Sequence, residues 1–151
     1  MLPPFPPARH VKGFSLVEIL LTMALISIVL AISVPSYRKL QSANDLSVAM
    51  STLSQALRLA ELKAQAVVEG SGWGVHAETG AVIIFKGSSF ASRDQTRDEV
   101  FSFSGSIAIT APADVFFAPL YGTPVAPAVW ELSGIGETRS VSVNSLGILS
   151  Y

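Results

Sequence analysis

The sequence KGFSLVE, from Lys12 to Glu18, opens an uninterrupted apolar run, FSLVEILLTMALISIVLAISV, which extends from Phe14 to Val34. The run is 21 residues long and contains one ionisable side chain, Glu18. A helix rises about 1.5 Å per residue, so roughly 20 apolar residues are enough to cross the hydrocarbon core of a bilayer. The sequence therefore predicts a membrane-spanning helix that carries one carboxylate.

Glu18 is the exception in this run, because a charge inside a membrane helix costs at least about 2.5–3.5 kcal/mol on insertion scales. Glu18 follows Phe14 by four residues, so a helix places both on one face, one turn apart. If the chain were cut after Gly13, the new amino group of Phe14 would be largely cationic at neutral pH, since such groups have a pKa of about 8. That ammonium could neutralise Glu18 in its own chain or in a neighbouring one.

The stretch from Lys12 to Glu18 resembles the processing site of type IV prepilins and type II secretion pseudopilins. The resemblance implies that a prepilin peptidase cuts after Gly13 and methylates the new terminus at Phe14. It further implies that Glu18 helps to set the stagger of subunits in a helical filament, and that the long helix bends or melts locally at Pro35. The motif is specific, because a basic leader, a Gly-aromatic junction, a glutamate and an apolar run occur together. An ordinary single-span anchor with a stray glutamate is the alternative.

The amino-terminal residues 1–13, MLPPFPPARHVKG, contain four prolines and two basic residues, Arg9 and Lys12. Prolines disfavour a helix, and basic residues beside a span favour the cytoplasmic side. We therefore expect a cytoplasmic leader at 1–13, a membrane and assembly helix at 14–35, and an extracytoplasmic head at 36–151. A secretory signal peptide fits poorly, because its apolar stretch of about 7–15 residues is shorter than this run. The expected location is the inner membrane, and a surface filament after assembly.

The composition agrees with one anchored domain, since 151 residues suggest a single domain by length. The chain has no cysteine, which excludes disulfides and cysteine-ligated metals. Many pilin heads carry a carboxy-terminal disulfide, and this chain departs from them. Removing the leader changes the formal charge from −1 to −3, with 8 basic and 11 acidic side chains remaining. This balance does not indicate a polyanion-binding protein.

The range 36–69 has the clearest helical periodicity outside the apolar run. Apolar residues recur there at alternating steps of four and three, which predicts one apolar stripe along a helix. The stripe consists of Leu46, Met50, Leu53, Leu57, Ala60, Ala64 and Val67. Gly70 is a natural left-handed stop, so the helix is predicted to end near Glu69. A short coiled coil is the alternative, but weak charge pairing favours a helix packed on the chain's own sheet.

From residue 72 onward the pattern becomes that of strands. Trp73–Ala77 and Ala81–Phe85 flank a short glycine-containing loop and predict a hairpin. Residues 86–99 are polar, and we expect an exposed loop there. Prolines separate further short strands, predicted at Val100–Phe103, Ile107–Thr110, Val115–Ala118, Ala128–Leu132, Ser140–Val143 and Ile148–Tyr151. Trp130 is expected in the core. The predicted fold is α+β, a long amino-terminal helix packed on a small antiparallel sheet at 72–151.

Two more stretches, Leu57–Gly70 followed by Trp73-Gly74-Val75, and Glu137–Tyr151, resemble the pseudopilin H and FimT group of minor pilins. Some members of that group bind DNA during uptake through basic residues near the carboxy terminus. In this chain Arg139 is the only basic residue after Arg97. Phosphate recognition needs clustered positive charge, so the sequence argues against nucleic-acid binding.

No catalytic residue, cofactor site or metal site is predicted. His76 is the only histidine outside the leader, and no nucleophile elbow accompanies it. The glycine-rich stretch Gly70–Gly74 follows a helix, whereas a phosphate-binding loop precedes one. No cluster of Asp, Glu and His has metal-ligand spacing, and a calcium site made of backbone carbonyls stays an open alternative.

The predicted function is that of a non-enzymatic structural subunit, a minor pilin or pseudopilin of a type IV pilus or type II secretion-like filament. Its expected partners are the prepilin peptidase, other pilin or pseudopilin subunits, and an assembly platform in the inner membrane. Two alternatives are a minor pilin for DNA uptake and a membrane-anchored binding module that never polymerises.

Overall fold

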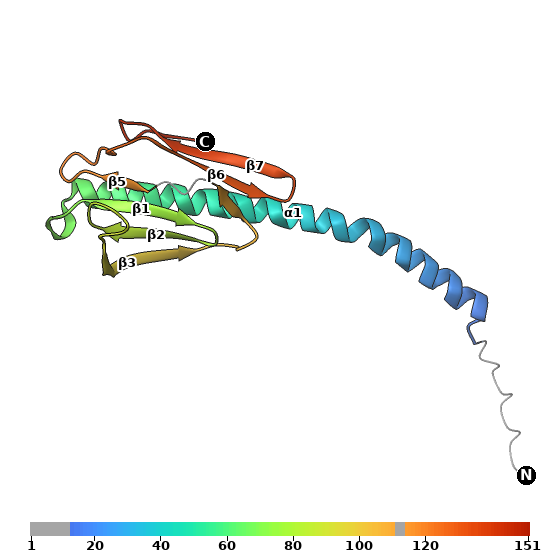
Figure 1. The fold of residues 1–151 in the computed structure, drawn as a ribbon. Coiled ribbons are helices and arrows are strands. Elements are labelled where there is room, and N and C mark those ends of the chain that lie inside the picture. The colour runs from blue at the N-terminus through green and yellow to red at the C-terminus, as the bar shows by residue number, and fades with distance from the viewer. Residues whose placement is uncertain (1–12, 111–113) are drawn as a thin grey trace, which may run out of the picture. The chain divides into compact units, whose positions relative to one another are not determined.

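The structure, a computed structural model, describes residues 13–110 and 114–151 (Figure 1). The chain divides into two compact units, residues 1–37 and 38–151. One helix, α1 (Leu16–Gln65), contributes to both units. Apart from Gly13, the predicted leader lies outside the described residues, as does Pro112.

The first part of α1, up to Tyr37, is apolar on every side. Its large apolar side chains from Leu16 to Val34 are 46–76 % exposed. Among the described residues, α1 is the one helix that is long and apolar enough to cross a membrane. A helix that is apolar all round is typical of a membrane span or of a protein core. The helix continues through Pro35, and the bend or local melting expected there stays a prediction.

The second part of α1, residues 38–65, buries one stripe. Six of the seven predicted stripe residues, those from Leu46 to Ala64, are buried, which confirms the helical periodicity. The seventh, Val67, is half-buried and lies beyond the end of the helix, in a left-handed conformation. The helix ends at Gln65, four residues earlier than predicted, and a short 3₁₀ helix, η1 (Val68–Gly70), follows. The physical reason is a cap from a distant loop. The carbonyl of Ala64 accepts hydrogen bonds from the N–H groups of Val67 and Leu120, both at 3.1 Å, in place of a further helical turn.

The strands form two four-stranded antiparallel sheets, where one small sheet was predicted. The first sheet has the order β3-β2-β1-β5 and consists of β1 (Trp73–Glu78), β2 (Ala81–Lys86), β3 (Asp94–Ser102) and β5 (Val115–Phe117). The second has the order β4-β6-β7-β8 and consists of β4 (Ala108–Thr110), β6 (Ala128–Gly134), β7 (Glu137–Val143) and β8 (Leu149–Ser150). The α+β fold class is confirmed.

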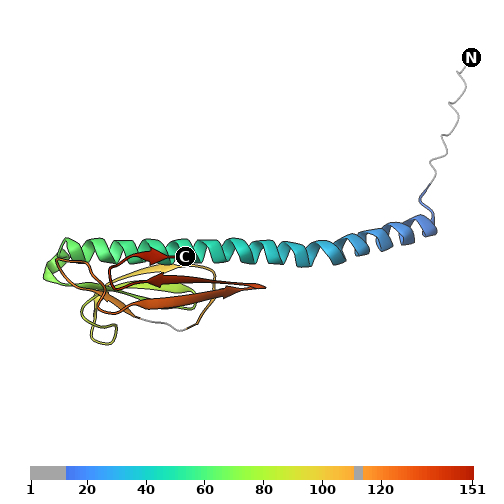
Figure 2. The same ribbon diagram turned by 90° about the horizontal axis from the view of Figure 1, so that it is seen from above.

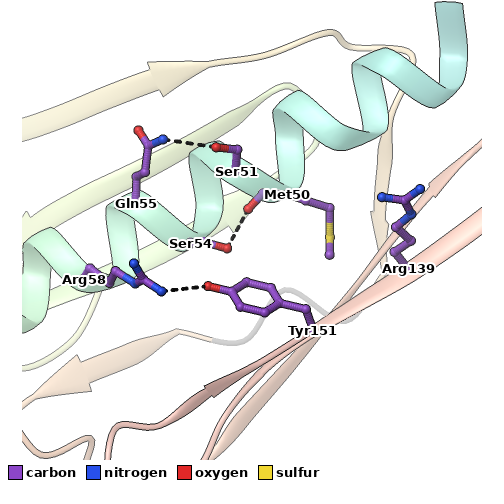
Figure 3. A pocket seen from close by; sticks show the side chains of 7 residues that line it. All are labelled: Met50, Ser51, Ser54, Gln55, Arg58, Arg139 and Tyr151. Atoms are coloured by element: carbon purple, nitrogen blue, oxygen red, sulfur yellow. Dashed lines mark hydrogen bonds between the residues drawn. The ribbon is translucent and has the colours of Figure 1, made fainter.

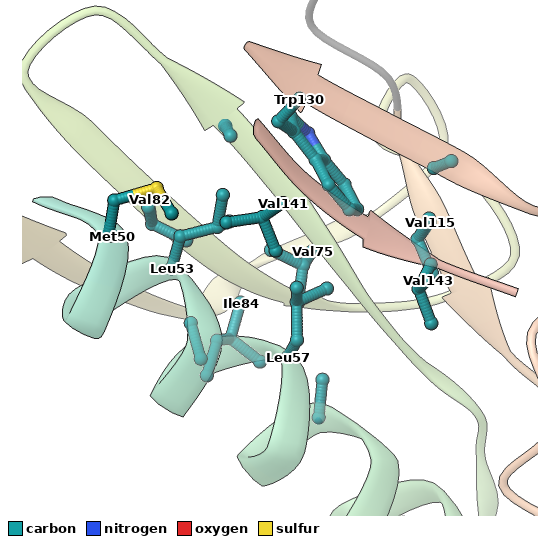
Figure 4. Close-up of a cluster of buried hydrophobic side chains, with 14 of the residues drawn as sticks. Met50, Leu53, Leu57, Val75, Val82, Ile84, Val115, Trp130, Val141 and Val143 are labelled. Atoms are coloured by element: carbon teal, nitrogen blue, oxygen red, sulfur yellow. The ribbon is translucent and has the colours of Figure 1, made fainter. Parts of the chain in front are cut away.

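The core of the head lies between the second part of α1 and the two sheets (Figures 1 and 2). Figure 4 shows the helix residues Leu53 and Leu57 close to Val75 and Ile84 of the first sheet. Trp130 of the second sheet is fully buried, as predicted. Both sheets therefore share one core with the helix.

The polar stretch 86–99 differs from the prediction. Only residues 87–93 form a loop, because β3 begins at Asp94 and continues to Ser102. β3 is the outermost strand of its sheet, where charged side chains stay in solvent while the backbone pairs with β2. The apolar alternation that reveals a half-buried strand is therefore missing from this sequence.

Candidate processing and assembly site

The residues before α1 form an exposed segment without regular secondary structure. Phe14 is 80 % exposed, and Gly13 is exposed as well. A Cβ atom added at Gly13 would meet nothing within 4 Å. The described part of the fold therefore leaves room for a side chain at position 13.

Ser15 caps the amino terminus of α1. Its Oγ accepts a hydrogen bond from the backbone N–H of Glu18 at 3.2 Å, and its carbonyl accepts one from Ile19 at 3.2 Å. Ser15 and Glu18 have the Ser-x-x-Glu spacing of a capping box. Ser15 is absent from the sequence-based prediction, although this spacing is a readable signal. The cap starts the helix immediately after the predicted cleavage point.

Glu18 lies in the first turn of α1 and is exposed. A carboxylate is favoured there by the partial positive charge of a helix amino terminus. Within the described residues Glu18 forms no ion pair. The structure thus brings Gly13, Phe14 and Glu18 together at one helix end. Pro35 lies roughly five turns further along.

The hydroxyl side chains of the apolar part satisfy their own hydrogen-bond donors. Each donates to a backbone carbonyl three or four residues earlier, at 2.8–3.2 Å; the four are Thr22, Ser27, Ser33 and Ser36. Such bonds remove the penalty of placing a hydroxyl in hydrocarbon. Glu18 is the single acidic or basic side chain from Phe14 to Val34 and has no such local partner among the described residues.

The head carries few unpaired positive charges. Five of its eight Lys and Arg side chains form ion pairs in the described part of the chain: Lys63, Lys86, Arg93, Arg97 and Arg139. The hydrogen bond from Lys86 lowers the pKa of Glu69, and the charge of Arg97 lowers it further. The pKa of Asp94 is lowered by hydrogen bonds from the Thr96 hydroxyl and backbone N–H. In the described part of the head, most of the basic side chains thus already have a carboxylate beside them.

A groove of about 430 Å³ lies beside α1 and the last residues of the chain (Figure 3). It is lined by Met50, Ser51, Ser54, Gln55, Arg58, Arg139 and Tyr151. Arg58 donates to the hydroxyl of Tyr151 at 3.3 Å, and Ser54 donates to the carbonyl of Met50 at 2.7 Å. Among the described residues, the polar lining consists of two guanidinium groups, one phenol, two hydroxyls and one amide.

His76, the one histidine in the described residues, contacts Asp114 and Phe90 in the head. Its Nδ1 lies 2.5 Å from a carboxylate oxygen of Asp114, and its ring stacks on Phe90 at 3.8 Å. In residues 13–110 and 114–151, no group of three or more His, Cys, Asp or Glu side chains is placed to hold a metal ion.

A comparison with known protein families finds a match at the amino terminus of the chain. Residues 8–34 match the family described as the prokaryotic N-terminal methylation motif. No curated protein and no solved structure matches the chain. The matched range contains Gly13, Phe14 and Glu18, and the remainder of the chain has the α+β arrangement of one long helix on antiparallel sheets. The matched motif indicates a type IV pilin-like prepilin that is processed by a peptidase, and the long apolar helix fits a membrane anchor.

Proposed function

We propose that this chain is a minor pilin or pseudopilin. In this proposal the prepilin peptidase cuts between Gly13 and Phe14 and methylates Phe14, and the mature chain assembles through residues 14–35. The observation that carries the proposal is the first part of α1, which is apolar on every side and has its one carboxylate beside the matched cleavage motif. The filament is a type IV pilus or a type II secretion-like pseudopilus.

The apolar part of α1 serves two environments in turn. Before assembly the inner membrane holds it, with residues 1–13 in the cytoplasm and the head at 36–151 on the other side. During assembly on the platform it leaves the bilayer and packs against the same part of neighbouring subunits. Both environments are apolar, so the self-bonded hydroxyls from Thr22 to Ser36 are tolerated in each.

Glu18 gives the packing of the apolar helices in the filament a defined axial position. In a filament its carboxylate pairs with the methylated ammonium of Phe14 from a neighbouring subunit, and this pair sets the axial position of the incoming helix. Apolar packing alone allows a helix to slide, whereas a buried charge is tolerated only opposite its partner. Pro35, which has no N–H to donate, would let the helix bend or melt locally after the assembly part.

Within the pilin class, the resemblance of Leu57–Gly70 and of the carboxy-terminal stretch supports a pseudopilin H or FimT-like subunit. A role in DNA uptake is not supported by the charges of the head. Arg139, the only base near the carboxy terminus, pairs with Glu137 at 2.7 Å. The proposed work is structural and includes no chemical step.

The test compares Glu18→Ala with wild type in membrane and sheared-filament fractions of cells. The variant should be cleaved and retained in the membrane, yet be depleted from filaments or fail to start them. Removing the carboxylate leaves an ammonium unpaired in an apolar setting, at a cost of about 3–5 kcal/mol per contact.

The matched control is Thr22→Val, one turn further along the same helix. It removes a hydroxyl whose hydrogen bond is local, so incorporation should be normal. Normal incorporation of Glu18→Ala would show that apolar packing alone sets the stagger. A mature chain that never appears in filaments, even as wild type, would instead support the membrane-anchored binding module.

A further inference from the structure

The two sheets of the head have four outer strands, and only one of them is long. β4, β5 and β8 contain two or three residues each, whereas β3 contains nine. β3 pairs with β2 on one side, and no described strand pairs with its other side. Proteins usually block such an edge by keeping the strand short or by charging it, because a free edge can pair with another chain.

β3 is charged in its first part only. Asp94, Arg97, Asp98 and Glu99 are followed by Val100, Phe101 and Ser102, which carry no charge. The charged part is engaged in ion pairs, among them Arg97 with Glu69 and Glu99 with Lys63. The uncharged part is open, with Val100 58 % exposed and Phe101 38 % exposed. The usual protection of an edge strand therefore stops at Glu99.

The hydrogen-bond pattern shows which backbone groups of β3 face outward. The N–H of Phe103 donates to the carbonyl of Gly80 at 3.0 Å, and Phe101 lies opposite Val82 in the same antiparallel register. In an antiparallel pair, every second residue directs both its N–H and its C=O toward the neighbour. Phe101 and Phe103 thus bond to the β2 side, while Val100 and Ser102 direct their backbone groups to the free edge.

A groove runs beside this free edge. It has a volume of about 390 Å³ and is lined by Thr52, Gln55, Ala56 and Leu59 of α1 together with Val100, Phe101 and Ser102. Phe101 lies opposite Val82, which belongs to the buried core under the helix, so Phe101 is on the helix-facing side of the sheet. A strand added beside β3 would therefore direct every second side chain into the groove.

We propose that the edge formed by Val100–Ser102 is an acceptor site for an extended, uncharged segment of a partner protein, which adds to the first sheet as an antiparallel strand. A row of outward N–H and C=O groups is complementary to another extended main chain. Because Val100–Ser102 carry no charge, they do not repel an approaching main chain. They also offer no opposite charge to a charged segment, so an uncharged segment is favoured. The groove receives the side chains at the two positions that flank the residue opposite Val100, and Ala56, Leu59 and Phe101 of its mixed polar and apolar lining offer apolar contacts there.

A second copy of the same edge fits less well. Pairing β3 with itself about Val100 requires a two-fold axis normal to the sheet, which reverses the direction of the helix packed on its face. The second parts of α1, residues 38–65, would then run in opposite directions in the two heads. Under the proposed function the helices of neighbouring subunits run in the same direction, so this edge is suited to a different chain segment.

The test uses the full chain in detergent micelles and the peptide acetyl-Thr-Val-Thr-Val-Thr-amide, labelled for a fluorescence titration. Its valines match the groove positions, and its central threonine lies opposite Val100. We expect saturable binding, and slower hydrogen exchange at the amides of Val100 and Ser102. Methylating the nitrogen of the central threonine removes a donor that faces β3, and affinity should fall by about fivefold or more, as for the loss of one backbone hydrogen bond. Methylating a valine nitrogen, which faces away, should have little effect.

Two variants test the edge from the protein's side. Val100→Lys charges it, and Val100→Pro removes an N–H that bonds to nothing in β2, so both should fold and lose peptide binding. The matched control is Val129→Lys, a valine of similar exposure (52 %) on β6 of the second sheet, where it lies opposite Ser142 of β7. This control should bind as wild type does.

Three results would overturn the proposal. The first is an absence of saturable binding. The second is equal binding of the two methylated peptides, which would mean that the groove takes side chains without strand pairing. The third is slow hydrogen exchange at the amides of Val100 and Ser102 in the absence of peptide, together with a dimer that Val100→Lys dissociates. That result would mean that a second copy of the chain occupies the edge.

Discussion

The two parts of α1 have the same backbone conformation and opposite surroundings. Leu25, in the first part, is 56 % exposed, whereas Leu57, in the second, is 1 % exposed. In the first part apolar residues surround the helix, and in the second they form one stripe. A helix with one apolar stripe can be covered by sheets of its own chain. A helix that is apolar all round needs an apolar environment from outside the chain.

The serines of the two parts differ in the same way. Ser27 and Ser33 donate to carbonyls of their own helix. Ser42, the first buried residue of α1, instead accepts a hydrogen bond from the backbone N–H of Ile135 at 2.7 Å, in the turn between β6 and β7. A Cβ at Gly134 would collide with the Ser42 hydroxyl, so the close approach depends on glycine at that position. The comparison teaches that α1 begins to have partners in its own chain at Ser42.

The largest effect is expected on cleavage of the leader, just before the first part of α1. Gly13→Val should leave the leader attached in all molecules, because a prepilin peptidase subsite close to the backbone has no room for a branched side chain. Mass spectrometry of wild type should show a chain that begins at methylated Phe14. Ser15→Ala, on the other side of the bond, should be cleaved. An intact Met1 terminus in wild type, in cells with the peptidase, would contradict the proposed processing.

The next largest effect is on the stability of the head, and it is tested by a leucine-to-alanine change at three positions of α1. Leu57→Ala should lower the free energy of unfolding of the head by about 2–5 kcal/mol, because it leaves a cavity in the core. Leu62→Ala, at a side chain that is 60 % exposed, should change it by less than about 0.5 kcal/mol. Leu25→Ala should not change it. The measurement is urea unfolding in detergent micelles followed by tryptophan fluorescence, since both tryptophans, Trp73 and Trp130, belong to the head. Equal effects at Leu57 and Leu62 would show that the stripe does not pack.

A smaller effect is expected at Ser42. Ser42→Ala removes the acceptor for the Ile135 N–H and should destabilise the head by about 1–3 kcal/mol in the same assay. Ser47→Ala is the control, because Ser47 donates only to Ala43 of its own helix, at 3.0 Å. If both changes left the stability unchanged, the hydrogen bond between Ser42 and the β6–β7 turn would contribute nothing to the stability of the head. The serines of the two parts of α1 would then not differ in their energetic role.

The smallest effect concerns pH. The pKa of Glu69 in the folded head is lowered from its ordinary value of 4.5, chiefly by the hydrogen bond from Lys86. Its contribution to stability is therefore present above pH 4.5 and is lost as the pH falls through the lowered pKa. Glu69→Gln should flatten the dependence of the urea midpoint on pH below about pH 5, and Lys86→Met should do the same. An unchanged slope in Glu69→Gln would mean that these charges do not stabilise the folded head.

Much of the fold was predictable because its periods are long and regular. The apolar run is uninterrupted over 21 residues, and the stripe from Leu46 to Ala64 has helical spacing over many turns. The hairpin of β1 and β2 has its glycine at a turn position, Gly80, with a φ of +88°. Each of these signals is local. The helix end was missed by four residues, because the cap on Ala64 comes from Leu120, far along the chain.

The candidate processing site is a local feature of the sequence. Gly13, Phe14 and Glu18 lie within six residues, and an enzyme that binds an extended segment needs little of the fold. The sequence by itself therefore determined the match to the methylation motif, the apolar run long enough to cross a membrane, and the buried stripe. The tertiary structure alone decided that the strands form two sheets, that 94–99 continue as β3, and that the edge at Val100–Ser102 has no described neighbour. Strand pairing is a contact between distant residues, and an edge strand exposed to water keeps no apolar pattern by which its sequence would show it.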